Sequence, residues 1–146
     1  MLAACGGGSD SDGAQPQAVT FVFRLHGLPA AEEFRASTAS PDVIAAARAQ
    51  LRLPVSARRL FATGAIRAGD ASANPGWRWH LVQLELAEVT IELCDGRPSM
   101  VEADLGYWLG TVGRFCPWSS YVHAELPTIV QAQPQARHLQ SPLAGR

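Results

Sequence analysis

Val19-Thr20-Phe21-Val22-Phe23-Arg24-Leu25 is the stretch with the clearest secondary-structure signal in the chain. Large apolar side chains fall on every second residue, and the polar Thr20 and Arg24 fall between them. This alternation, built from β-branched and aromatic residues, is typical of a β-strand that turns one face to a core. We therefore expect a strand over residues 19–25.

Two later stretches have the spacing of helices. Ser40-Pro41-Asp42 offers an N-cap, a proline at the first helical position and an acid in the first turn, and apolar residues recur at helical spacing until Pro54. The second helix is predicted to begin at a capping box of Ser99 and Glu102 and to end near Gly113.

Three more stretches read as strands, namely residues 60–67, 77–94 with a break near 84–86, and 121–126. The resulting order is β-α-β-β-α-β. Two such units commonly close as a ferredoxin-like α+β fold, a four- to five-stranded antiparallel sheet with both helices on one face. The fifth strand stays open because the long third region could hold two strands.

Length and composition leave room for one domain. The chain has 146 residues, 47% hydrophobic and 17% charged, which fits an ordinary globular protein. We assign residues 1–18 to a truncated signal and a flexible leash, and residues 19–126 to a single α+β domain. Residues 127–146 are polar, follow no period and are expected to form a disordered tail.

The charged residues argue against a nucleic-acid partner. All twelve basic residues are arginine, they are spread along the chain, and the formal net charge is -1. A nucleic-acid-binding surface needs clustered positive charge and a basic balance. The one tight pair, Arg58-Arg59, is interpreted as a solvated surface pair.

The N-terminus, Leu2-Ala3-Ala4-Cys5, resembles the lipobox of bacterial lipoprotein precursors, which places Cys5 at the lipidation site. The glycine- and serine-rich residues 6–13 have the composition of a flexible leash. Met1 stands where an apolar signal segment should end, so the chain is interpreted as a truncated precursor. Gly6 is not the aspartate that retains such proteins in the inner membrane. The resemblance therefore implies a lipid anchor in the outer membrane of a bacterial envelope, with the domain periplasmic or surface-exposed.

Cys94 and Cys116 remain as a pair once Cys5 is set aside. In an oxidising compartment two such thiols are expected to form a disulfide, which could stabilise the fold by roughly 3 kcal/mol. The alternative is that Cys94 is a small buried apolar residue at a strand end.

Three further segments are distinctive: Asn74 to Leu81, Ile91 to Gly96, and Phe115-Cys116-Pro117-Trp118-Ser119-Ser120. Together they resemble the small domain found at the N-terminus of a slime-mould binding protein and, alone, in bacterial secreted proteins and lipoproteins. The resemblance covers roughly Val19 to Leu126. It implies export and a domain of this extent, and it implies no activity.

Four tryptophans in so small a domain exceed what a core requires, and tryptophan is frequent at binding hot spots. Trp108 lies on the apolar stripe of the second predicted helix and is expected in the core. Trp118 follows a proline in a predicted loop and could equally well lie at a contact surface. The candidate contact surface consists of Trp118, Ser119, Ser120, His80, Asp95 and Trp77, with the turn at residues 74–76.

Catalysis and metal binding are the competing interpretations. His80, Asp95 and Ser119 or Ser120 are the residue types of a hydrolytic triad, but the chain has no Gly-x-Ser-x-Gly elbow. His80, Glu92 and Asp95 could be proposed as metal ligands, yet their spacing matches no zinc signature. We expect no metal and no cofactor.

The leading hypothesis is a non-catalytic, extracytoplasmic binding module. Its expected partners are the membrane, through lipid on Cys5, and a protein of the envelope. One version is a peptidase inhibitor that presents a rigid loop. The alternatives are a small secreted hydrolase that uses His80, and a structural envelope lipoprotein.

Overall fold

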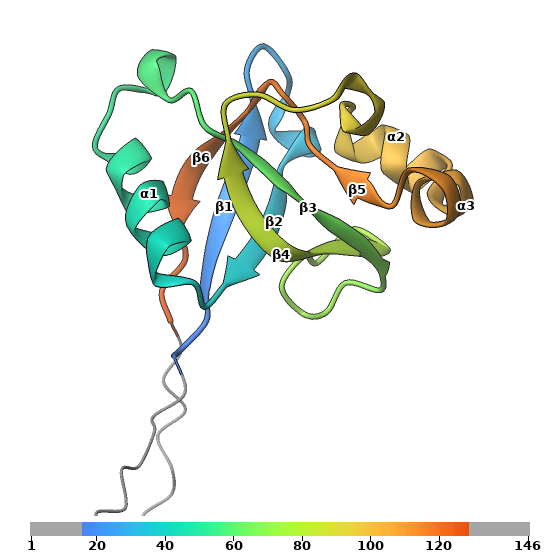
Figure 1. Cartoon of the computed structure of the whole chain (residues 1–146), viewed down its shortest axis with the longest axis horizontal. Helices are drawn as coiled ribbons and strands as arrows, with labels where there is room; N and C mark the ends of the chain where they lie inside the picture. The colour runs from blue at the N-terminus through green and yellow to red at the C-terminus, as the bar shows by residue number, and fades with distance from the viewer. Residues whose placement is uncertain (1–15, 129–146) are drawn as a thin grey trace, which may run out of the picture.

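The computed structural model describes residues 16–128, which form two three-stranded antiparallel sheets with several short helices (Figure 1). The lipidation candidate Cys5, the leash over residues 6–13 and residues 129–146 of the predicted tail lie outside the described residues. Across residues 16–128, no helix combines the length and apolar character that a membrane span requires. The fold is mixed α+β, as the sequence predicts.

The first sheet has β1 (Val19–Leu25) at its centre, between β2 (Phe34–Thr38) and β6 (Ser120–Glu125). The strand predicted over residues 19–25 is confirmed. Both neighbours run antiparallel to it. β2 was not predicted because it is short and buries only Phe34 and Ala36, which is too few positions to show an alternation.

The second sheet has β3 (Phe61–Ala68) at its centre, between β4 (Trp79–Ala87) and β5 (Arg114–Phe115). The register of β3 on β4 shifts at Gly64. A Cβ atom on Gly64 would lie 2.9 Å from the carbonyl oxygen of Val82, so the backbones approach too closely for any other residue.

The structure corrects the predicted ferredoxin-like sheet. The six strands divide into two sheets, so no single sheet of four or five strands forms within residues 16–128. The segment 88–94 is not a strand: β4 ends at Ala87, and a short 3-10 turn covers Glu92–Cys94. Its alternating Val89, Ile91 and Leu93 are 85%, 69% and 66% exposed, so their alternation does not mark a buried face.

The first helix, α1 (Pro41–Leu51), begins where the sequence predicts. The Oγ of Ser40 accepts a hydrogen bond from the backbone N–H of Val43, which satisfies a free donor of the first turn. Arg48 forms a bidentate ion pair with Glu125 of β6, with N···O distances of 2.9 and 2.7 Å. This pair fastens the helix to the edge of the first sheet.

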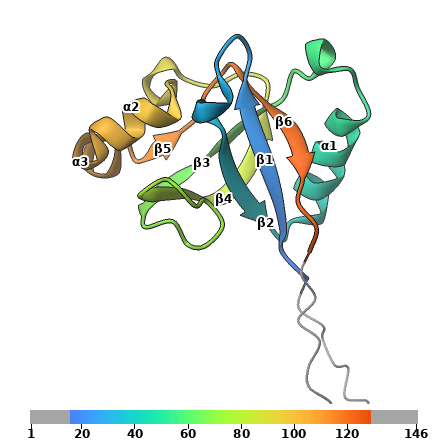
Figure 2. The same ribbon diagram turned by 180° about the vertical axis from the view of Figure 1, so that it is seen from behind.

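The second predicted helix is broken into three parts: α2 (Pro98–Ala103), α3 (Leu105–Tyr107) and a π-helical turn (Trp108–Val112). Asp104 interrupts it with a backbone φ of -135°, and Gly113 ends it with a φ of +72°. Figures 1 and 2 show α1 on one side of the sheets and α2 with α3 on the other. The prediction of both helices on one face is therefore also corrected.

The predicted capping box of Ser99 and Glu102 does not form. The N-cap of α2 is Arg97, and the hydroxyl of Ser99 donates to the carboxylate of Glu32 at 2.6 Å. Glu102 accepts a hydrogen bond from the backbone N–H of Arg78 at 3.0 Å. Both side chains therefore serve contacts between distant segments, which sequence spacing cannot show.

The core between the sheets is built around Phe115. Its ring centroid lies 5.6 Å from that of Phe34, 5.2 Å from Trp79 and 5.7 Å from Trp108, all edge-on. Edge-to-face contacts of this kind are favourable beyond the burial of their area. The prediction that Trp108 is a core residue is confirmed, since it is 5% exposed.

The two ends of the described chain lie side by side. The backbone N–H of Leu126 donates to the carbonyl of Thr20 at 2.9 Å, and Figures 1 and 2 show both ends leaving from the same end of the domain. From there β1 runs to the opposite end, where His26 follows it. Seven residues of extended strand cover about 23 Å.

Candidate functional site

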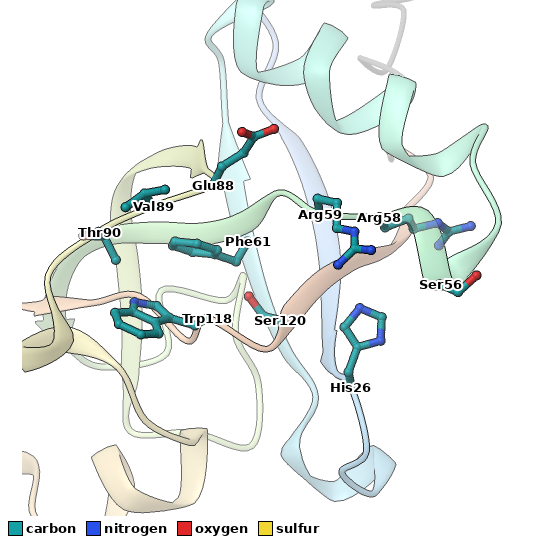
Figure 3. Close-up of a pocket in the computed structure, with 10 residues that line it drawn as sticks. All are labelled: His26, Ser56, Arg58, Arg59, Phe61, Glu88, Val89, Thr90, Trp118 and Ser120. Carbon is teal, nitrogen blue, oxygen red and sulfur yellow. The ribbon is translucent and has the colours of Figure 1, made fainter.

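An open groove of about 870 Å³ lies at the end of the domain opposite the chain termini (Figure 3). Three loops form its walls: residues 56–61 before β3, residues 88–90 after β4, and residues 118–120 before β6. His26, just past β1, completes it. Both sheets therefore contribute to the groove.

The floor of the groove contains Phe61 and Ser120, which are 3% and 2% exposed. The Oγ of Ser120 accepts a hydrogen bond from the backbone N–H of Ala62 at 3.1 Å. Because Ser120 begins β6 and Ala62 belongs to β3, this bond joins the two sheets directly beneath the groove.

The apolar side of the groove is formed by Trp118 and Val89. Trp118 is 41% exposed and Val89 is 85% exposed, which is unusual for such large apolar residues. In Figure 3 the indole of Trp118 lies beside Phe61 and Thr90. An exposed indole next to a concave surface is the arrangement expected of a contact site rather than of a core.

The loop that presents Trp118 is braced at two points. Its backbone N–H donates to the Oδ1 of Asp95 at 2.9 Å, and the N–H of Cys116 donates to the carbonyl of Cys94 at 2.8 Å. Cys94 and Cys116 are joined by a disulfide, which confirms the predicted pairing. The buried sulfurs pack on Phe61, so one staple supports both the floor and the apolar wall.

The basic side of the groove begins with Arg58, whose guanidinium is fixed by backbone carbonyls. It donates to the carbonyl oxygens of Val122 at 2.8 Å and Leu53 at 3.0 Å, with longer bonds to Leu51 and His123 at 3.4 Å each. All of these acceptors are neutral. The positive charge of Arg58 is therefore held in place without a carboxylate against it.

Arg59 lies next to it and is exposed. Among the four ion pairs of residues 16–128, none includes Arg59. Figure 3 shows its guanidinium directed toward the ring of His26, which stacks on Tyr121 at a centroid distance of 4.3 Å. The groove thus has an apolar side and a cationic side.

His123 lies on β6, close behind the basic side. Burial is the main factor that lowers the pKa of its imidazole below the ordinary value of 6.5, and the positive charges of Arg24 and Arg58 lower this pKa further, against an opposing effect of Glu33. Its Nδ1 is buried and has no hydrogen-bond partner within residues 16–128. The neutral form of this histidine is therefore favoured.

Four of the predicted contact residues come together at the groove. Trp118 and Ser120 line it. Ser119 is exposed between them, and its carbonyl accepts a hydrogen bond from the backbone N–H of His26 at 2.8 Å. Asp95 is exposed, and its role is to hold the loop through the Trp118 amide.

His80 lies elsewhere. It pairs with Arg67 at the far end of the β3–β4 ladder, whereas Phe61 and Ala87 pair at the groove end. Its Nδ1 hydrogen-bonds the carbonyl of Gly69. Seven residues along a strand put His80 about 23 Å from the groove.

Trp77 and the turn at residues 74–76 also belong to that far end, and they have structural roles. The indole N–H of Trp77 donates to the carbonyl of Glu33 at 2.9 Å. Asn74 is 1% exposed; its Oδ1 accepts from the backbone N–H of Arg35 at 2.9 Å and its Nδ2 donates to the carbonyl of Trp79 at 2.8 Å. The predicted contact surface therefore splits in two, and only its Asp95–Ser120 part adjoins the groove.

The catalytic and metal interpretations gain no geometry from this arrangement. Asp95 and Ser120 lie near the groove, but the proposed base His80 is at the other end of the second sheet. A triad needs its three side chains in hydrogen-bond contact. Within the described part of the chain, no three His, Cys, Asp or Glu side chains are grouped as a metal site would require.

Sequence reasoning missed Arg59, Val89, Phe61 and His26 as groove residues. Arg58-Arg59 was interpreted as a solvated surface pair, which fails for Arg58 because its guanidinium is bonded to the backbone. Val89 was hidden because its alternation with neighbours predicts a strand. No sequence signal marks His26, since only the pairing of β1 with β6 brings it to the groove.

Comparison with known proteins places these features in a family. Neither the curated proteins nor the solved structures contained a match to the chain. A family model does match, over residues 17–129, and includes every residue of the groove and the disulfide. The chain therefore belongs to the family described as the BP-74 N-terminal domain.

Proposed function

We propose that this domain is a non-catalytic binding module whose ligand occupies the groove, and that lipid on Cys5 holds it at the bacterial envelope. The observation that carries the proposal is the exposed indole of Trp118 on a loop braced by a disulfide and by Asp95. A rigid, exposed aromatic side chain loses little entropy on binding. This is the economy expected of a recognition site.

The position of the chain ends supports display away from a membrane. The chain enters β1 at the end of the domain opposite the groove. A lipid on Cys5 would therefore approach the domain from that end, and the groove would face outward. The same orientation serves a periplasmic and a surface-exposed protein.

Fragment screening by NMR tests the binding part of the proposal. A library that contains neutral, cationic and anionic compounds should shift the amide resonances of residues 118–120 and 88–90. Trp118→Ala should weaken this binding, because it removes the apolar wall, and Trp118→Phe should retain part of it. Since Trp118 is 41% exposed, the free energy of unfolding of the Ala variant should lie within about 1 kcal/mol of the parent value. A library that shifts no groove resonance would refute the proposal.

Mass spectrometry of the protein purified from its own host tests the anchoring part. A fatty-acylated N-terminal peptide that begins at Cys5 is expected, together with a Cys94–Cys116 peptide that separates only after reduction. A host protein without acyl groups would refute the lipid anchor and leave the groove proposal standing.

Peptidase inhibition is a specific version that the braced loop favours. Inhibitory loops need to hold one conformation when a protease docks on them, and the loop before β6 is fixed by a disulfide and two backbone hydrogen bonds. Assays against serine, cysteine and metallopeptidases, with Trp118→Ala as the matched variant, would support this version if one class is inhibited and the variant is weaker.

A further inference from the structure

We infer that the groove selects an anionic ligand, an organic carboxylate carried on a flat or branched apolar group, and that Arg59 binds the carboxylate. This inference rests on the proposed function, because it names the chemistry of the ligand in the same groove. It follows from the distribution of charge and apolar surface around the walls.

The groove has more positive than negative charge. Arg58 and Arg59 supply two guanidinium groups on one wall, and Glu88 is the one acid among the groove residues. Figure 3 shows the carboxylate of Glu88 directed away from the guanidinium of Arg59. No ion pair within residues 16–128 joins Glu88 to either arginine. The excess positive charge is therefore left for a ligand.

The two arginines have different roles. The nitrogens of Arg58 are occupied by backbone carbonyls, so Arg58 contributes charge rather than new hydrogen bonds. The side chain of Arg59 makes no hydrogen bond or ion pair with the other residues of the described chain, and it is exposed. Its planar fork can bind both oxygens of one carboxylate. One free fork matches one singly charged head group.

The opposite wall suits an apolar body. Trp118 and Val89 expose large apolar surface there, and Phe61 lies at the base between the walls. A volume of about 870 Å³ is within the range of small-molecule sites. A ligand with an apolar group at one end and a carboxylate at the other would cover both walls at once.

Two probes of equal shape separate the charge from the apolar group. 3-Phenylpropanoate and 3-phenylpropanamide carry the same ring, and only the first is anionic. Titration of the folded domain, followed by NMR, should show the acid binding about fivefold or more tightly than the amide, since hydrogen bonds to an ionised partner are the stronger ones. The preference should shrink in about 0.5 M NaCl, a salt level at which exposed charges are largely screened.

Arg59→Gln should bring the acid-to-amide ratio close to one and leave amide binding unchanged. Arg67→Gln is the matched control, because Arg67 is exposed on β3 at the end far from the groove; it should keep the full preference. Trp118→Ala should weaken acid and amide by the same factor. Circular dichroism confirms that each variant is folded.

N-acetyl-phenylalanine identifies the source of the carboxylate. It carries the same ring and charge with the amide of a peptide C-terminus, so tighter binding than phenylpropanoate indicates a protein end, and weaker binding indicates a free organic acid. Equal binding of acid and amide at the groove, or a preference for the amine 3-phenylpropylamine, overturns the inference and leaves the proposed function intact. Failure of every probe and every library compound at the groove overturns both.

Discussion

Removal of the Cys94–Cys116 disulfide should destabilise the domain by about 3 kcal/mol. The two cysteines are 22 residues apart, and closing a loop of that size lowers the entropy of the unfolded chain by an amount worth about 3 kcal/mol at 25 °C. Near the unfolding transition of a domain of this size, this loss corresponds to a fall in Tm of about 12 °C.

Two perturbations separate the cross-link from the packing of the sulfurs. Reduction of the parent removes the cross-link and leaves two thiols in place. The double variant Cys94→Ala and Cys116→Ala also removes buried atoms, since Cys94 is 2% exposed and Cys116 is fully buried. The double variant should therefore lose about 1 kcal/mol more than the reduced parent, because cavities remain beside Phe61.

Urea unfolding at 25 °C, with and without reductant, measures both effects. The parent should respond to reductant and the double variant should not, which makes the variant its own control. A loss below about 1 kcal/mol on reduction would refute the reasoning, since it would mean that loop closure contributes little to this fold.

Three smaller perturbations test other contacts. Asn74→Ala removes a buried side chain that bonds two backbone groups, and urea unfolding should show a loss of about 3 kcal/mol; a loss below about 1 kcal/mol would contradict its bridging role. Ser120→Ala leaves the Ala62 N–H without its acceptor, so stability should fall by about 1–3 kcal/mol and this amide should exchange faster; unchanged exchange would contradict the bond. His123 has a folded pKa below 6.5, so the unfolded chain takes up the proton first, and stability should fall as pH drops through 6.5 toward the lowered pKa; His123→Phe should flatten this slope, and an identical slope would rule out His123 as its source.

Parts of the fold that depend on local signals were predicted. The alternation over residues 19–25 reported β1, and Ser40-Pro41-Asp42 reported the start of α1, because caps and strand alternation act within a few residues. β2 and β5 were missed because short strands carry too few buried positions to form a pattern. The division into two sheets depends on which strands pair, and that information is not local.

The site shows the same division. Trp118, Ser119 and Ser120 were predicted because the Phe115–Ser120 segment is unusual in composition, and the disulfide was predicted from cysteine parity. His80 and Trp77 were grouped with them only because their residue types are suggestive; the strand register puts them at the other end of the β3–β4 ladder. Arg59 was dismissed as a surface charge, since its lack of a carboxylate partner is visible only in three dimensions.

The hydrogen bond between Leu126 and Thr20 has a practical consequence for experiments and for larger proteins. An affinity tag, a biotin or a neighbouring domain attached to either terminus would emerge at the pole remote from Trp118, so immobilisation on a sensor chip leaves the recognition surface accessible. By the same geometry, the module can be grafted into a loop of a host protein as a protruding head, because entry and exit points of the inserted chain are already adjacent.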